Sequence, residues 1–212
     1  LKTNKPIGVF YLDNFARDGK RSGAWMTTYR SQQKLGGTRN VLASNNNNFT
    51  EAAKGEPTLI SIDDAQTLFH EFGHGIHFLL YDITYPALAG VPRDFVEYPS
   101  QVNENWLMTP EVLSKFATHY QTGEPIPQAL VDKILASDTF NQGFSTVEYL
   151  ASAIVDMKLH NRTTPPTDIA KFERETLAEI GMPKEIVMRH RLPQFGHLFS
   201  SDSYSAGYYS YL

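Results

Sequence analysis

Residues 63–81 constrain the fold more than any other part of the sequence, because they combine a helical apolar pattern with two histidines four positions apart. The apolar positions that keep helical spacing are Leu68, Phe69, Phe72, Ile76 and Leu80. Asp63 or Asp64 is expected to cap this helix at its start. His70 and His74 then lie about 40° apart on one face, one turn from each other. Both imidazoles can therefore bind the same metal ion.

Glu71 follows His70 directly, within the sequence HEFGH of residues 70–74. It points to the flank of the site, where its carboxylate can take a proton from water bound to the metal. The chain contains no cysteine, which excludes disulfides, thiolate catalysis and cysteine-type zinc sites. Zinc suits the pair because imidazole is a good zinc ligand without any thiolate partner. The pattern therefore predicts a hydrolytic metal site.

A catalytic zinc site needs a third protein ligand and keeps its fourth position for water. The candidate carboxylates are Asp82, Asp94, Glu97 and Glu104. Asp82 is at the far end of the same helix, and Asp94 suits the ordinary role of an acidic residue in a first helical turn. Glu97 and Glu104 are seven residues apart and share a helix face, so one can bind the metal while the other orients a histidine. Spacing alone does not choose between them.

His77 lies on the same helix face, about 20° from His70. About 10.5 Å of axial rise separates the two, too far for both to bind one ion, so a packing or supporting role is expected for His77. A zinc class that places a third histidine six residues after the second is excluded, because residue 80 is leucine.

The remaining chain predicts a mainly α architecture with a small N-terminal β element. Residues 7–30 alternate apolar and polar side chains around Asp18-Gly19, which predicts one or two short strands with a hairpin-like connection. Residues 36–58, with the run Asn45 to Asn48, are expected to be solvated loop. Further helices are expected at 97–107, from Pro110 to about Gly123, and at 127–137, 145–161, 167–180 and 183–190.

Composition and charge limit the partners. Lys plus Arg number 19 and Asp plus Glu number 23, so the net charge is −4, with the two signs interspersed. Such a chain lacks the cluster of basic residues that binds nucleic acid or an anionic membrane. Its apolar runs are far shorter than the ~18 residues of a membrane span. We expect neither nucleic acid nor a membrane as a partner.

Both ends of the sequence indicate a piece of a longer chain. Residue 1 is leucine, and residues 208–212 stop inside an aromatic, apolar run, whereas exposed termini are usually polar. We expect residues 1–212 to be part of one domain truncated at both ends, with the remainder of the parent chain as its partner.

Two stretches, HEFGHGIH at 70–77 and GVPRDFVEYPSQVNENW at 90–106, resemble the thimet oligopeptidase family of zinc metallopeptidases. The form PRDFVE…PSQ.NE.W is most similar to the family's bacterial peptidyl-dipeptidase branch. The stretches at 139–160 and 197–212 are similar to the same branch. The resemblance covers most of residues 5–212, and it implies a zincin-like metallopeptidase catalytic domain of which this chain is an incomplete part.

The resemblance implies one zinc ion held by His70, His74 and Glu97, with Glu71 as the general base. It further implies that the substrate cleft is lined by His197, Tyr204, Tyr208 and Tyr211. The hydroxyls of the three tyrosines can donate to an oxyanion, on a segment whose glycine, Gly207, permits movement. The implied reaction is hydrolysis of short peptides, releasing C-terminal dipeptides through zinc-bound water activated by glutamate. The cytoplasm is the expected location.

Two alternatives stay open at this stage. An oligopeptidase cleaves internally in short peptides, and a non-catalytic helical binding module uses a histidine pair structurally. Dipeptide release needs a cation for the free substrate carboxylate, and Arg93, Arg189 and Arg191 are candidates, each with an ordinary interpretation as a surface charge.

Overall fold

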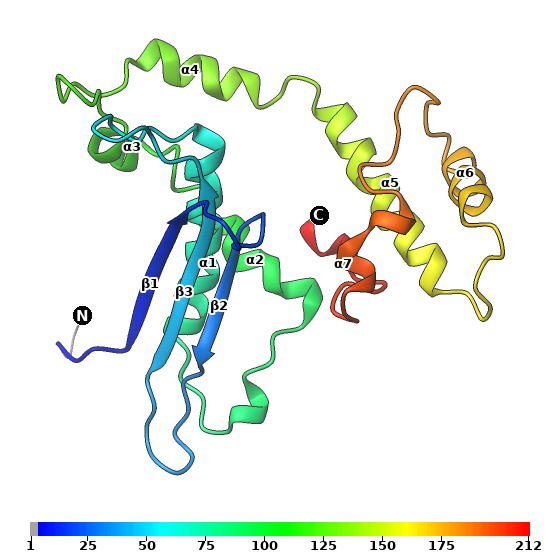
Figure 1. Cartoon of the computed structure of the whole chain (residues 1–212), viewed down its shortest axis with the longest axis horizontal. Helices are drawn as coiled ribbons and strands as arrows, with labels where there is room; N and C mark the ends of the chain where they lie inside the picture. Colours follow the sequence, from blue (N-terminus) through cyan, green and yellow to red (C-terminus); the bar gives the residue numbers. More distant parts are fainter. Residues whose placement is uncertain (1–3) are drawn as a thin grey trace. The chain divides into compact units, whose positions relative to one another are not determined.

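The computed structural model describes residues 4–212, which form two compact units (Figure 1). Unit 1 contains the chain up to Pro92 together with Val96–Pro127. Unit 2 contains Arg93–Phe95 and Gln128–Leu212. Most of the regular structure is helical, and a three-stranded sheet lies in the N-terminal part, so the expected mainly α architecture with a small β element is confirmed.

The sheet of unit 1 has three strands, β1 (Gly8–Phe15), β2 (Trp25–Arg30) and β3 (Val41–Phe49), in the order β1-β3-β2. β3 pairs in parallel with β1 and antiparallel with β2. The strands expected within 7–30 are therefore present, but the hairpin-like connection is wrong. β1 and β2 do not pair with each other because β3, which was expected to be loop, separates them.

The asparagine run is the buried centre of the sheet and not a solvated loop. Asn45, Asn46 and Asn47 are all buried. The side-chain nitrogens of two of them have partners: Asn46 Nδ2 donates to the Trp25 carbonyl at 3.2 Å, and Asn47 Nδ2 donates to the side chain of Asn14 at 3.1 Å. Buried polar groups are tolerated when they are hydrogen-bonded, so polar composition does not prevent a central strand here.

Helix α1 (Ile62–Leu79) packs on β3 and confirms the helical pattern. Its cap is Ser61, so the expectation of an aspartate cap was wrong. The Ser61 hydroxyl accepts from the Asp64 N–H at 3.0 Å, and the Asp64 carboxylate accepts from the Ser61 N–H at 3.1 Å. This reciprocal pair is a capping box, which makes Asp64 the third helical residue and fixes where the helix begins.

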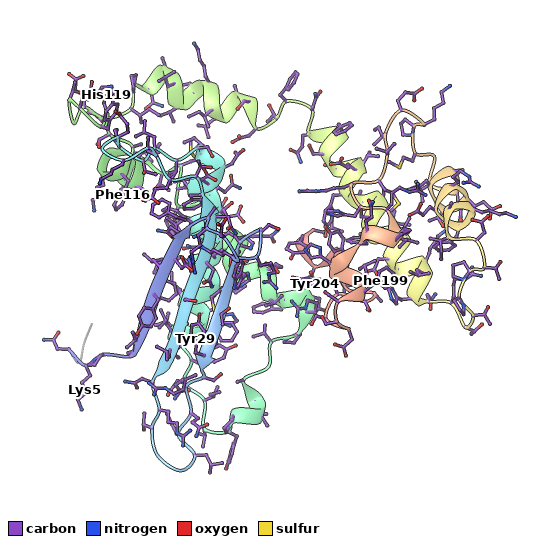
Figure 2. All side chains as sticks on the ribbon, viewed as in Figure 1. Lys5, Tyr29, Phe116, His119, Phe199 and Tyr204 are labelled. Carbon is purple, nitrogen blue, oxygen red and sulfur yellow. The ribbon has the colours of Figure 1, made fainter. Side chains whose placement is uncertain are left out.

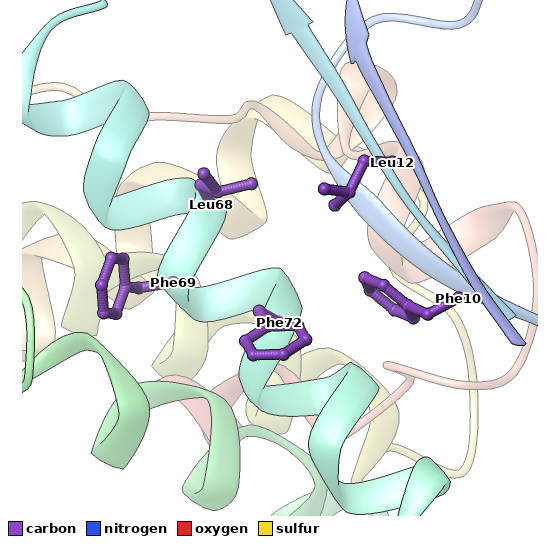
Figure 3. Close-up of a pocket in the computed structure, with 5 residues that line it drawn as sticks. All are labelled: Phe10, Leu12, Leu68, Phe69 and Phe72. Carbon is purple, nitrogen blue, oxygen red and sulfur yellow. The ribbon is translucent and has the colours of Figure 1, made fainter. Parts of the chain in front are cut away.

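The apolar side of α1 faces strand β1 across a cavity of about 230 Å³ (Figure 3). The cavity is lined by Phe10, Leu12, Leu68, Phe69 and Phe72. The rings of Phe10 and Phe72 meet edge to face, with centroids 5.4 Å apart. This apolar packing fixes which side of α1 faces the sheet, and the two histidines lie on another side of the helix.

Two helices and one 3-10 turn complete unit 1, namely η1 (Pro86–Leu88), α2 (Arg93–Glu104) and α3 (Pro110–Phe116). The first three residues of α2 belong to unit 2. α2 begins four residues before the expected position, directly after Pro92, and includes Pro99. α3 begins at the expected proline but ends at Phe116, well before Gly123.

Unit 2 contains α4 (Gln128–Ser137), α5 (Gln142–His160), α6 (Ile169–Glu179), η2 (Leu192–Gln194), α7 (Gly196–Phe199) and η3 (Tyr208–Tyr211). The first three lie close to expected helices. The helix expected at 183–190 was wrong: those residues form turns and irregular chain, and Met188 is buried in the core. Packing of that side chain, and not helical periodicity, explains its apolar character. The core around it contains Ala151, Val155, Leu192, Phe195, Leu198 and Tyr208.

Within residues 4–212, no helix combines the length and the apolar character needed to cross a membrane.

Candidate metal centre

Three side chains of unit 1 converge on one point. His70 and His74 come from α1, and Glu97 comes from α2. The Oε2 atom of Glu97 lies 3.2 Å from His70 Nε2 and 3.1 Å from His74 Nε2. One ligand atom from each residue lies within 4.8 Å of the other two, and Glu97 is only 3% exposed. Two imidazoles and one carboxylate in this arrangement form a donor set that suits zinc.

The close approach of α1 and α2 depends on Gly73. A Cβ atom at this position would lie 2.6 Å from Ser100 Cα and 2.9 Å from the Pro99 carbonyl oxygen, which are backbone atoms of α2. Asn103 adds a bond between the helices by donating to the Phe69 carbonyl at 2.7 Å. Glycine therefore lets the two helix backbones meet, and this contact brings the carboxylate of α2 to the histidines of α1.

Glu104 contacts the other nitrogen of His70. Its Oε1 atom lies 2.6 Å from His70 Nδ1, and its Oε2 atom accepts from Gln66 at 2.7 Å. A carboxylate on Nδ1 fixes the ring so that Nε2 faces the cluster. Of the two carboxylates that spacing left open, Glu97 lies in the three-residue cluster, and Glu104 contacts a histidine from outside it.

The cluster is strongly coupled electrostatically. Burial opposes protonation of His70, but the hydrogen bonds to Glu104 and Glu97 outweigh it and raise the pKa of His70 to about 9. Burial also disfavours the charged form of Glu97, yet His70 and His74 hold the pKa of Glu97 far below its usual range. Without a metal, the ionised Glu97 is therefore balanced by a proton on His70, which a cation can replace.

Glu71 is 6% exposed, and its Oε2 atom has no hydrogen-bond partner in the described part of the chain. Burial raises the pKa of this carboxyl, while the charges of His70 and His74 and the backbone N–H of Met26 act in the opposite direction. A buried, unpartnered carboxylate oxygen needs a donor from outside the protein. A water molecule at the metal cluster meets that need, so the residues present fit a hydrated metal ion.

Asn45 was missed by sequence reasoning, which treated the asparagine run as loop. It is 0% exposed and contacts the peptide group that joins Glu71 to Phe72. With its amide oriented to satisfy both groups, its nitrogen donates to the Glu71 carbonyl at 2.9 Å and its oxygen accepts from the Phe72 N–H at 3.0 Å. The central strand thus holds the backbone of α1 at Glu71. The buried strand itself is the signal that would have revealed this contact.

The other candidates from the sequence lie elsewhere. Asp82 is paired with Lys34 at 2.5 Å on the surface, and Asp94 is exposed in the first turn of α2. His77 is outside the three-residue cluster and packs against the rings of Phe78 and Tyr81, at centroid distances of 5.7 and 5.2 Å.

The four cleft candidates gather in unit 2. The ring of His197 lies 5.6 Å from the rings of both Tyr204 and Tyr208. The Tyr204 ring stacks on that of Tyr211 at 5.7 Å, and their hydroxyls are 2.6 Å apart. Burial raises the pKa of Tyr208, while burial and the nearby charges of His190 and Arg189 lower the pKa of His197. Figure 2 shows Tyr204 in this C-terminal region.

The three candidate arginines differ in their surroundings. Arg191 is bound to the buried carboxylate of Glu173, with Nη2 2.7 Å and Nε 3.0 Å from Oε2. The guanidinium of Arg93 lies 4.4 Å from the centre of the Tyr204 ring. Arg189 is exposed. The charge of Arg191 is thus already neutralised by Glu173, whereas within residues 4–212 neither Arg93 nor Arg189 forms an ion pair.

Residues 2–212 match the sequence model of Peptidase family M3. The chain belongs to this family. The resemblance carried by residues 70–77 and 90–106 is thereby confirmed. The chain is 41% identical to the dipeptidyl carboxypeptidase of Escherichia coli, and the match covers 97% of this chain and 31% of that protein. It is 40% identical to Oligopeptidase A of the same organism, covering 100% and 32%.

Saccharolysin of Saccharomyces cerevisiae is 32% identical to this chain, over 97% of this chain and 30% of that protein. The chain therefore spans about a third of the length of the curated relatives it matches. That third contains the whole three-residue cluster and Glu71.

Proposed function

We propose that this chain carries the metal centre of a zincin-like zinc peptidase that hydrolyses short peptides. The observation that carries the proposal is the convergence of two imidazole nitrogens and one carboxylate oxygen, together with the buried, unpartnered oxygen of Glu71, the residue that follows His70. A structural metal site does not need a buried base beside it. The proposal also treats residues 1–212 as part of one catalytic domain of a longer chain.

His70, His74 and Glu97 would hold one zinc ion. A zinc ion bound by three protein ligands supplies a Lewis acid that polarises a carbonyl and acidifies water. Glu104 keeps His70 oriented for this role, because its carboxylate occupies the opposite ring nitrogen at 2.6 Å. The helix contact at Gly73 keeps Glu97 within reach of both histidines.

Glu71 would act as the general base. Its Oε2 atom accepts the proton of the attacking water and then delivers it to the nitrogen of the leaving amine. The raised pKa of Glu71 suits the first of these steps, because a stronger base takes the proton of water more readily. Asn45 holds the backbone on both sides of the peptide bond after Glu71, so the carboxylate is carried by a rigid segment.

We propose that His197, Tyr204, Tyr208 and Tyr211 line the substrate cleft. Three phenols and an imidazole in one cluster provide several donors for a developing oxyanion and for substrate backbone carbonyls. Sequence similarity to the family over residues 197–212 supports the same assignment.

We propose release of dipeptides from the substrate's C-terminus as the specific mode. The similarity to dipeptidyl carboxypeptidase supports this mode. It needs a cation for the substrate carboxylate, and the bond between Arg191 and Glu173 leaves Arg93 and Arg189 as the better candidates. Internal cleavage of short peptides is the second candidate function, and the nearly equal identity to Oligopeptidase A favours it.

Metal analysis combined with peptide hydrolysis tests the proposal on the natural full-length protein. We expect one zinc per chain, hydrolysis that stops on chelation and returns with zinc, and faster cleavage of a peptide with a free C-terminus than of its C-terminal amide. Equal rates on the two peptides would favour internal cleavage. Absence of zinc-dependent hydrolysis of either peptide would contradict the peptidase proposal itself.

A further inference from the structure

The backbone between Tyr204 and Tyr208 adopts a conformation that its sequence does not favour. Ala206 has a φ of 57°, in the left-handed region that non-glycine residues rarely occupy. No regular helix or strand covers residues 203–207. A strained turn of this kind persists only where its surroundings determine it, so some part of unit 2 has to hold it.

Asp156 of α5 is the group that meets this turn. Its Oδ1 atom accepts from the Ala206 N–H at 2.9 Å, and its Oδ2 atom accepts from the Tyr208 N–H at 3.0 Å. His160, one turn along α5, lies with Nδ1 2.7 Å from Oδ1. Asp156 is 0% exposed, and its carboxylate receives three N–H donors. A buried carboxylate is stabilised by such charge-assisted hydrogen bonds.

A second residue of α5 holds the same segment from its other side. The hydroxyl of Tyr149 donates to the Tyr208 carbonyl, and the two rings stack with centroids 5.4 Å apart. Asp156 and Tyr149 are two helical turns apart on α5, and together they bond to both the N–H and the carbonyl of Tyr208. In sequence, Tyr204 precedes this anchored residue and Tyr211 follows it. The hydroxyls of Tyr204 and Tyr211 are 2.6 Å apart.

We infer that Asp156 is a positioning residue that holds the phenols of Tyr204, Tyr208 and Tyr211 in place. The inference rests on the proposed function, in which those phenols face the substrate. Asp156 does not itself reach substrate. It acts by fixing the backbone of the segment that carries the donors, and His160 keeps its carboxylate in the orientation that both backbone N–H groups require.

Asp156→Asn tests the inference in the zinc-loaded full-length protein. The asparagine keeps the size of the side chain, but its NH₂ group cannot accept a hydrogen bond, so at least one of the two N–H groups loses its partner. We expect hydrogen exchange in the peptide covering 203–212 to accelerate about tenfold or more. We expect kcat to fall about 10–100-fold with a smaller change in KM, and zinc content to stay the same.

Glu173→Gln is the matched control. Glu173 is also buried, at 4% exposure, and in the described part of the chain its carboxylate bonds to the Leu192 N–H at 2.6 Å and to Arg191, not to the tyrosine segment. This variant should leave exchange in 203–212 unchanged. If Asp156→Asn accelerates exchange uniformly across unit 2, or leaves 203–212 unchanged, the positioning role is wrong. If the variant does not fold, unprotected Ala206 and Tyr208 amides in the unmodified protein overturn the inference.

The two proposals fail in different ways. Absence of zinc-dependent hydrolysis in the unmodified protein contradicts the proposed function, while exchange in 203–212 still tests the anchoring by Asp156. Faster exchange in the variant with unchanged kcat shows that the segment is anchored but that its phenols do not serve the reaction, which overturns the positioning role.

Discussion

Glu104 Oε1 lies 2.6 Å from His70 Nδ1, on the side of the imidazole opposite to Glu97. The two carboxylates are seven residues apart on α2. Glu104 contacts the Nδ1 atom of His70, and Glu97 contacts its Nε2 atom. Only Glu97 also reaches His74, at 3.1 Å. The same helix face thus provides a ligand candidate and the group that orients a ligand.

This division of roles predicts unequal effects on zinc affinity. Glu104→Ala should weaken zinc binding about 10–100-fold, because it removes only the orientation of His70. Glu97→Ala should weaken binding far more, because it removes a donor atom. Competition with a chromophoric chelator measures both variants. The reverse order would mean that the two carboxylates have exchanged roles.

The proton on His70 predicts how zinc affinity depends on pH. In the metal-free protein the pKa of His70 is about 9, while zinc binds neutral imidazole. Between pH 7 and 9 the proton has to leave, so affinity should rise about tenfold per pH unit and level off above pH 9. Titration calorimetry in buffers of different ionisation enthalpy should show about one proton released per zinc at pH 7.5.

Glu104→Gln is the control for this dependence. It removes the hydrogen-bonded charge that raises the pKa of His70, so the rise in zinc affinity should level off at a lower pH than in the unmodified protein. An affinity that does not change between pH 7 and 9 in the unmodified protein would contradict the electrostatic description of the cluster.

Gly73→Ala should weaken both the fold and the metal site. The new methyl group would meet backbone atoms of α2 at 2.6 and 2.9 Å, and a helix backbone cannot move without moving Glu97. We expect a loss of about 1–3 kcal/mol in the free energy of unfolding, together with lower zinc affinity. Chemical denaturation and chelator competition measure the two effects.

Gly143→Ala is the matched control, since a Cβ at this position in α5 meets nothing within 4 Å. Alanine has the higher helix propensity, so this variant should be neutral or slightly stabilising and should leave zinc affinity unchanged. If Gly73→Ala behaves like the control, the helix contact does not place Glu97.

The histidine pair could be predicted from sequence because both ligands lie on one helix, where periodicity determines their relative position. For the third ligand, spacing alone could not choose between Glu97 and Glu104. The distance between two helices depends on Gly73 and Ser100, which are 27 residues apart in sequence, and no local pattern encodes that contact.

The central strand could not be predicted because its evidence is non-local. The asparagines of β3 resemble solvated loop until the carbonyls and amides that receive them are known, such as Trp25 and Asn14. The same reason applies to Asp156, whose partners Ala206 and Tyr208 are 50 and 52 residues away. Its place in a helical pattern indicated nothing about a strained turn elsewhere.

Glu71→Gln tests the central claim most directly, because it changes the proposed base without changing a zinc ligand. Glutamine has nearly the same size and helix propensity, so zinc content and folding should match the unmodified full-length protein. We predict one zinc per chain and a kcat for peptide hydrolysis lower by about 10²–10⁴-fold. Undiminished hydrolysis by a zinc-loaded Glu71→Gln variant would contradict the account.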